Sequence, residues 1–423
     1  MIRATRIAAA AALAVASLAA VPVTTSATAA PVSAPSPAKA SPAAAPQKKE
    51  AFSLTLVLKN RTIVPSGDAQ GVGDVTVENG AVERDGAKAG TFITLSRVLS
   101  VPKKGVESRD AQITVQLKNG TIQLQAVNEE LSGEPFAVGR ILPIVGGTGD
   151  YAGAHGTCNL VPQGDKGRYL ALIDVVLAKD LKTSSAKVPA AQSVTVPAPQ
   201  GTKQGITGVT LKRAVGSTAS YTSIGTRVGS SSGTVRDSVE FLVTLEGGTL
   251  FARGIAESQQ RSVKAQTYAV LGGTGAYAGY RGELTLSAKA TGIQMRLVAP
   301  SGKKDTSLKW SEITGQQAEV PITGGNLLAA EGSIKGQKGK PTWVAYVATY
   351  QPVGDVTPAV TMVERTFTDG TMLVTGMTDD STVTEQYARP IIGGTGGLAG
   401  VGGEALSKPV SAARWDIVAA FWR

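Results

Sequence analysis

The sequence predicts an all-β protein made of three tandem small antiparallel eight-stranded β-barrels. The segment GGTG occurs three times, beginning at Gly146, Gly272 and Gly393, and an interval of about 120 residues suits one small domain rather than a solenoid repeat. A hairpin pattern precedes each copy at a similar distance. Apolar and polar residues alternate with a period of two elsewhere, and no segment after the N-terminal region shows a capped helical stripe.

Residues 1–30 are typical of a secretory signal peptide. Arg3 and Arg6 precede a run of Ala, Leu and Val, and Ala27 and Ala29 provide small residues in A-x-A spacing. A membrane anchor is the alternative, but alanine dominates the apolar run and a long polar stretch follows it. We therefore expect a secreted protein without stable membrane insertion.

Composition predicts where the rest of the chain divides into linkers and folded barrels. Residues 31–50 consist mainly of Pro, Ala, Ser and Lys, which predicts a disordered tether. Further linkers are expected where Pro, Ser, Lys and Thr collect. The predicted units are barrel 1 at 51–183, a linker at 184–204, barrel 2 at 205–298, a linker at 299–306 and barrel 3 at 307–423.

Each repeat contains a predicted β-hairpin before its GGTG segment. Two alternating runs are joined by Asn-Gly, Gly-Gly or Asp-Gly, which is a strong turn pattern. The sequences are QITVQLKNGTIQLQAV from Gln112, VEFLVTLEGGTLFARG from Val239 and TMVERTFTDGTMLVTG from Thr361. About eight strands in each repeat favour closure into a barrel, because closure removes exposed sheet edges. A β-sandwich is the alternative.

The glycine-rich segments do not fit a nucleotide-binding loop. A dinucleotide fingerprint needs a helix directly after the glycines, and a P-loop needs Gly-Lys-Ser/Thr. Here the chain continues as GTCNLVP, GELTLSA or GEALSKP, which is strand or loop sequence. Positive φ angles and close backbone approach at bulged connections explain the glycines better.

Composition also excludes several kinds of partner. The net charge is +10, but aromatic residues make up only 5% of the chain, so stacking platforms for single-stranded nucleic acid are absent from the sequence. Cys158 is the one cysteine, which rules out an intramolecular disulfide and predicts a small buried apolar side chain. One histidine and one cysteine cannot build a soft-ligand site, so we expect no metal and no cofactor.

The glycine-rich segments resemble those of allene oxide cyclases and dirigent proteins. The shared pattern is GGTG-x-[YF]-x-G-[AY]-[RH]-G after an apolar strand, with the hairpin and its xGT turn upstream. In the first repeat VGDVTVENG from Val72, AGTFITLSRV from Ala89 and VPKKG from Val101 follow in the order of that family. The resemblance covers most of the first repeat and mainly the second half of the others.

The resemblance implies an eight-stranded barrel around an apolar pocket, and barrels of this family commonly assemble as trimers. Three fused copies would then form a monomer with an intramolecular pseudo-trimer, because linkage makes association intramolecular. Some members guide a reactive intermediate to one stereoisomer without a cofactor.

The catalytic residues of the family do not transfer to this chain. Allene oxide cyclases carry a glutamate on the first barrel strand, and FSLTLVL from Phe52 has no acid. Their cysteine after an Ala-Gly pair corresponds to Phe92. The first interpretation is therefore a binding or interaction protein that holds a small apolar ligand. A cofactor-independent cyclase or stereochemical guide is the alternative, and an inward-facing acid beside a polar donor in any barrel would favour it.

The single histidine, His155, is a candidate catalytic residue. It precedes the last glycine of the first glycine-rich segment, where the second copy has Arg281 and the third has Gly402. A catalytic triad or a histidine metal site needs partner residues, and none is patterned around it. The variation among the copies indicates a tolerant surface position instead.

Three carboxylates and four aromatic residues complete the candidate sites. Glu364, Asp416 and Asp174 lie within alternating strands, where a carboxylate on an apolar face must find a partner or shift its pKa. An outward position at a contact between barrels is the alternative to a pocket role. The candidate ligand-binding residues are Phe92, Trp343, Tyr346 and Trp415.

Overall fold

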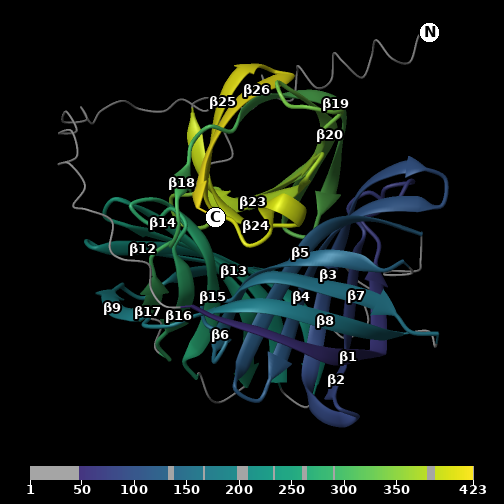
Figure 1. The fold of residues 1–423 in the computed structure, drawn as a ribbon. Helices are drawn as coiled ribbons and strands as arrows, with labels where there is room; N and C mark the ends of the chain where they lie inside the picture. The colour runs from purple at the N-terminus through teal and green to yellow at the C-terminus, as the bar shows by residue number, and fades with distance from the viewer. Residues whose placement is uncertain are drawn as a thin grey trace. The chain divides into compact units, whose positions relative to one another are not determined.

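The computed structural model describes residues 47–131, 138–164, 167–197, 208–231, 234–259, 264–288, 291–378 and 386–422. These residues form strands β1 to β26 and one 3₁₀ turn at Gly396–Leu398, which confirms the all-β prediction (Figure 1). They belong to one compact unit that spans 44–423. The predicted signal peptide at 1–30 and residues 31–46 of the predicted tether lie outside the described residues. Residues 47–50 of that tether are already part of β1.

The first repeat forms a closed antiparallel barrel of eight strands, in which β1 hydrogen-bonds to both β2 and β8. A bulge between Leu58 and Asn60 bends β1 between its two partners. The strands are β1 (Gln47–Val64), β2 (Val75–Arg84), β3 (Ala87–Lys103), β4 (Val106–Leu117), β5 (Gly120–Leu131), β6 (Arg140–Gly149), β7 (His155–Pro162) and β8 (Arg168–Ala178).

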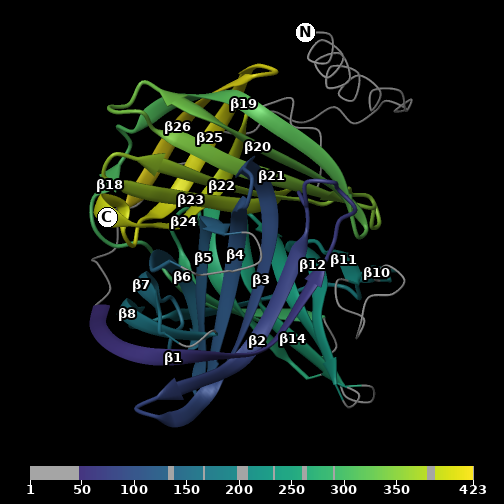
Figure 2. The same cartoon turned by 90° about the vertical axis from the view of Figure 1, so that its right-hand side faces the viewer.

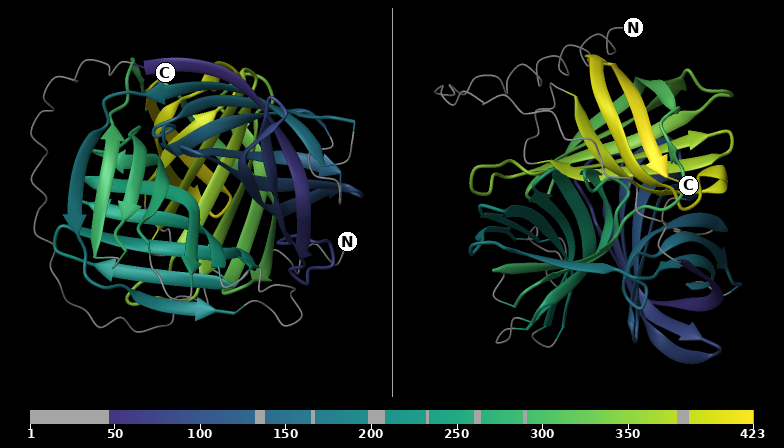
Figure 3. Two further views of the ribbon diagram at one scale, coloured as in Figure 1. Left: turned by 90° about the horizontal axis from the view of Figure 1, so that it is seen from below. Right: turned by 60° about the vertical axis from the view of Figure 1, so that its left-hand side comes forward.

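The second repeat forms a nine-stranded sheet that, in the part of the repeat that the structure describes, does not close by hydrogen bonds. The strands are β9 (Lys182–Lys187), β10 (Gln192–Val196), β11 (Val209–Val215), β12 (Ala219–Ser231), β13 (Thr234–Leu245), β14 (Gly248–Gln259), β15 (Gln266–Gly275), β16 (Arg281–Leu286) and β17 (Gly292–Val298). The edge strands are β9, which pairs with β17, and β10, which pairs with β11. The left view of Figure 3 shows this sheet face on.

This sheet differs from the predicted eight-stranded barrel because its closing strand is broken. In the first barrel one long strand, β1, bridges its two neighbours, whereas here residues 188–191 separate β9 from β10. Pro189 lies in this break, and proline has no backbone N–H to donate to a ladder. The described part of the predicted linker at 184–204 therefore contains most of β9 and all of β10.

The third repeat closes again. Strand β26 pairs with both β25 and β19, and the short β18 adds to β26 within the predicted linker at 299–306. In Figure 1 this barrel is seen nearly end on. Its strands are β18 (Lys304–Asp305), β19 (Lys309–Ile322), β20 (Gly325–Lys335), β21 (Thr342–Tyr350), β22 (Ala359–Phe367), β23 (Gly370–Thr378), β24 (Tyr387–Gly394), β25 (Gly402–Ser411) and β26 (Arg414–Trp422).

All three predicted hairpins are confirmed, and their alternation decides which side chains face inwards. The pairs that flank the turns are Leu117 with Gly120, Leu245 with Gly248 and Phe367 with Gly370. In β4 the predicted apolar face, with Ile113 and Val115, lies in the core inside the first barrel. The polar face, with Gln112 and Thr114, turns towards the neighbouring repeats.

A bulge directly before each GGTG segment contributes to the packing between repeats. Val145 in β6, Leu271 in β15 and Ile392 in β24 have no cross-strand partner at these bulges, and all three belong to one hydrophobic core shared by the three repeats. The last glycine of each segment has a positive φ, as the sequence predicts; the values are 63° at Gly149, 60° at Gly275 and 59° at Gly396.

The first glycine of each segment allows the next repeat to come close. A Cβ atom at Gly146 would lie 2.8 Å from Leu271, and one at Gly272 would lie 2.9 Å from Pro390. A Cβ atom at Gly393 would lie 3.2 Å from Pro143 in the first barrel. The contacts therefore run in a cycle from the first repeat to the second, the third and back to the first.

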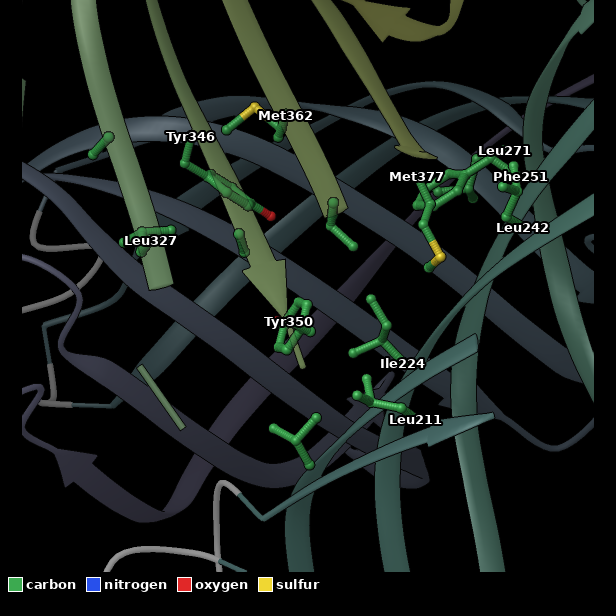
Figure 4. Packing of buried hydrophobic residues seen from close by; sticks show 14 of the residues in the cluster. Leu211, Ile224, Leu242, Phe251, Leu271, Leu327, Tyr346, Tyr350, Met362 and Met377 are labelled. Carbon is green, nitrogen blue, oxygen red and sulfur yellow. The ribbon is translucent and has the colours of Figure 1, made fainter. Parts of the chain in front are cut away.

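The shared core fills the centre of this arrangement. Figure 4 shows Tyr346 and Tyr350 of β21 on one face of their strand, above Leu211 of the second sheet, with Met377 close to Phe251. The strands of the third barrel cross over those of the first in Figure 2. Burial of apolar side chains on the outer faces thus holds three separately folded sheets in one unit.

Candidate functional site

The interior of the third barrel contains charged and aromatic side chains together. Val363 and Met372 belong to its inner core, so Arg365 on β22 also faces inwards by alternation. Only 1% of Arg365 is exposed. A charge at this depth needs partners, because desolvation of an isolated ion is very unfavourable.

Arg365 is paired with a glutamate in the same interior. Its Nε donates to Oε1 of Glu312 at 2.5 Å, and the same oxygen accepts from Nε1 of Trp310 at 3.0 Å. The guanidinium carbon lies 5.1 Å from the centre of the Trp310 ring. This acid is therefore held in place by a cation and an indole donor.

A second arginine, Arg389 on β24, lies in the same interior without a carboxylate partner among the described residues. Its Nη1 donates to the hydroxyl of Tyr387 at 2.7 Å, and its Nη2 donates to Oγ1 of Thr361 at 3.0 Å. Its guanidinium carbon lies 4.0 Å from the centre of the Tyr387 ring. Burial lowers the pKa of Arg389, and the tyrosine opposes that shift.

Three donors in this interior have no acceptor among the described residues. They are Nη1 of Arg365, Nε of Arg389 and Nε1 of Trp343. Trp343 lies directly opposite Arg365 in the ladder between β21 and β22, while Trp415 packs edge-on against Tyr387 at 5.7 Å. An aromatic interior with unused donors is suited to an apolar molecule that carries a hydrogen-bond acceptor.

The first barrel has a different polar group at one end of its interior. Glu78 on β2 is 2% exposed and lies on the same strand face as the core residue Val82. Its Oε1 lies 3.2 Å from Nε of Arg61. Burial raises the pKa of Glu78, although Arg61 and Arg109 oppose the shift. A buried carboxyl of this kind is a candidate proton donor or acceptor.

The four aromatic candidates occupy different places. Phe92 lies inside the first barrel, and Trp343 and Trp415 lie inside the third. Tyr346 faces outwards from the third barrel and contributes to the core between repeats. Sequence alternation alone separates Trp343 from Tyr346, since they differ by an odd number of positions.

Tyr346 borders a buried polar cluster at the junction of the repeats. Nε2 of Gln112 lies 3.4 Å from the Tyr346 hydroxyl and also contacts Asp110 of the first barrel and Glu240 of the second sheet. Arg253 of the second sheet donates to Gln125 of the first barrel at 2.8 Å, and Gln125 in turn donates to Asp110. Burial raises the pKa of Asp110 and of Glu240. The polar faces of equivalent hairpins therefore meet here.

The three candidate carboxylates all lie outside the barrel interiors. Glu364 accepts the backbone N–H of Val127 in the first barrel at 2.8 Å. Asp416 accepts from Ser311 at 2.7 Å, which is the main reason for its lowered pKa, and Asp174 is exposed beside Lys49. None of them lines a barrel interior.

His155 lies at a cavity between repeats, not at an isolated surface position. Burial lowers its pKa to about 3, with a further contribution from the nearby Arg281. Its Nδ1 lies 3.4 Å from the Gly153 carbonyl oxygen. Among the described residues, no cluster of three His, Cys, Asp or Glu side chains could hold a metal ion.

Sequence reasoning missed the polar residues inside the barrels. Period-two alternation along TMVERTF could have found Arg365, since it shares a face with Val363 and Phe367. The sequence around Glu312 and Glu78 has no comparable pattern, because pairing with distant strands decides which face of each strand lies inside the barrel.

Comparisons with known proteins give only weak matches to solved structures. No family model matches the sequence, and no curated protein matches it. Among solved structures, pyocyanin demethylase is 17% identical over 30% of this chain and 99% of its own, with a TM-score of 0.26. A pterocarpan synthase dirigent protein is 19% identical over 34% of this chain and 99% of its own, with a TM-score of 0.24. These low scores carry no argument about activity.

Across the described ranges, every helical segment is too short or too polar to cross a membrane.

Proposed function

We propose that the chain is a secreted binding protein whose third barrel holds a small aromatic or otherwise apolar molecule with an anionic group. Three buried donors without acceptors, Nη1 of Arg365, Nε of Arg389 and Nε1 of Trp343, carry this proposal. A buried donor that stays unpaired costs about 1–3 kcal/mol, and more if it is charged. A ligand oxygen would remove this penalty.

The charges inside this barrel favour an anion over a neutral ligand. Glu312 compensates Arg365 through a direct ion pair, whereas Arg389 has only neutral oxygens as partners. One arginine charge is thus left for a carboxylate or similar group, and Trp343 and Trp415 offer flat apolar surfaces for its rings.

Two probes that share one ring system test this proposal. We expect 1-naphthoate to quench the tryptophan fluorescence and to bind about tenfold more tightly than 1-naphthalenemethanol, because only the carboxylate can pair with the arginine. Arg389→Met should remove that preference. Arg236→Met is the matched control, since Arg236 is an exposed arginine paired with Glu257 in the second sheet.

Equal affinity for the two probes, or a preference that survives Arg389→Met, would contradict the proposed site. Native mass spectrometry of protein from its own secretion medium would show whether a small molecule is retained. The secretion part of the proposal rests on the N-terminal sequence, and protein sequencing of the secreted form should start near residue 31.

A second function is favoured by the buried Glu78. Its carboxyl lies inside the first barrel beside Arg61 and Arg109, which is the inward-facing acid and donor that would suit a cofactor-independent cyclase or stereochemical guide. The acid would transfer a proton, and the guanidinium groups would stabilise negative charge on an oxygen of the intermediate. Glu78→Gln should then abolish turnover of the retained compound, as followed by chiral chromatography, and leave naphthoate binding unchanged. Unchanged turnover would exclude this role.

A further inference from the structure

One cavity between the repeats is lined by equivalent residues from all three. Its volume is about 110 Å³, several times the roughly 10–15 Å³ that one water molecule requires. The equivalent positions occupied by His155, Arg281 and Gly402 all border it. The three glycine-rich segments thus converge here, on a pseudo-threefold arrangement in which each repeat supplies a different side chain.

The glycine in the third repeat makes room for the arginine in the second. A Cβ atom at Gly402 would lie 3.0 Å from Nη2 of Arg281, and one at Gly400 would lie 3.1 Å from Cδ2 of His155. The variation among His, Arg and Gly is therefore explained by packing around one centre, where three large side chains would not fit together.

Arg281 is buried there without a counter-ion. It is 6% exposed, and its Nη2 donates to the backbone oxygens of Gly400 at 3.3 Å and Val401 at 2.7 Å. Its Nη1 has no acceptor, and it forms no ion pair within the described part of the chain. Burial alone lowers its pKa to about 10, so the guanidinium remains charged at neutral pH.

The other groups around the cavity do not offset this charge. No aspartate or glutamate is among the residues that line it, and Lys179 adds a second, exposed cation. The low pKa of His155 keeps that side chain neutral. Gln47 and Ser301, which hydrogen-bond to each other at 2.7 Å, add polar groups to the lining.

We propose that this cavity binds a small oxyanion, such as a carboxylate or phosphate group, against the Arg281 guanidinium. Guanidinium groups match the geometry of such anions, and buried charges are normally paired. The bound anion would act as a common contact for the three repeats. This site is separate from the third barrel interior and does not depend on the function proposed there.

Anion titrations at constant ionic strength test the proposal. Phosphate or acetate, compared with chloride, should raise the thermal midpoint of the wild-type protein, because ligands that bind only the folded state stabilise it. Isothermal titration calorimetry with each anion gives the affinity and shows whether the site prefers a phosphate or a carboxylate.

Arg281→Gln should weaken that affinity about tenfold or more and remove the rise in midpoint. Arg236→Gln is the matched control, since it removes an exposed charge from the same sheet and should keep the full response. Lys179→Gln changes only an exposed residue, so it should fold normally and weaken binding by a smaller factor. The proposal is overturned if neither anion binds the wild type, or if Arg281→Gln binds as tightly as the control.

Discussion

The titration of Glu364 should make the protein less stable as the pH rises. Its carboxylate accepts the Val127 N–H across the contact between the third and first barrels. Burial raises the pKa of Glu364 from 4.5 to about 7, against the opposing effects of the Val127 hydrogen bond and Arg140. The folded protein therefore keeps a proton that the unfolded chain has already released between these two pH values.

The size and sign of this effect follow from linkage. Where the folded state binds more protons than the unfolded state, the free energy of unfolding decreases as the pH rises. One pKa unit corresponds to about 1.36 kcal/mol, so the shift of Glu364 predicts a loss of roughly 3 kcal/mol between about pH 4.5 and pH 7. The stabilisation from protonated Glu364 is complete below this pH range and absent above it.

Glu364→Gln removes the titration and keeps the side-chain shape. We expect the variant to match the wild type near pH 4.5 and to be roughly 3 kcal/mol more stable above pH 7, as measured by urea unfolding across this range. Glu257→Gln changes an exposed carboxylate paired with Arg236 and should follow the wild type closely. Parallel pH profiles for Glu364→Gln and the wild type would refute the argument.

Three further predictions concern packing and reactivity. Gly272→Ala should lower the free energy of unfolding by about 1–3 kcal/mol, because its new Cβ overlaps Pro390. Gly229→Ala is the control and should change this free energy little, since its Cβ would meet no atom within 4 Å. Equal effects of the two variants in chemical denaturation would contradict the close-approach explanation. Glu312→Gln should destabilise the third barrel by about 3–5 kcal/mol, since it leaves Arg365 unpaired, and adding Arg365→Met should restore most of the loss in a double-mutant cycle. Cys158 should resist thiol reagents in the folded protein at pH 8, because burial raises its pKa to about 12; rapid labelling under native conditions would show that the site opens.

Local sequence was sufficient for the features that depend on neighbouring residues. Alternation along Gln112 to Leu117 predicted a strand with an apolar face, and the Asn-Gly, Gly-Gly and Asp-Gly pairs predicted the hairpin turns. The positive φ of Gly149 and its counterparts also follows from local backbone sterics, which only glycine tolerates easily. These features need no knowledge of distant residues.

The break in the second sheet could have been predicted in part. Pro189 stands in a Pro- and Ser-rich stretch that composition assigns to a linker, yet strands on both sides of it pair with β17 and β11. Pairing with distant strands overrides weak local propensity, because the preference for strand depends mainly on packing against cross-strand neighbours.

By itself the sequence determined the all-β class, the three repeats, their hairpins and the tight glycine turns, because these follow from period-two patterning and backbone sterics. Only the tertiary structure decided that Arg365 and Glu312 share one interior, that Glu364 reaches another barrel, and that Arg281 lies unpaired where three repeats meet. The physical reason is that burial and charge pairing depend on residues far apart in the sequence, 53 positions for Glu312 and Arg365 and 237 for Val127 and Glu364, which come together only when the sheets close and pack.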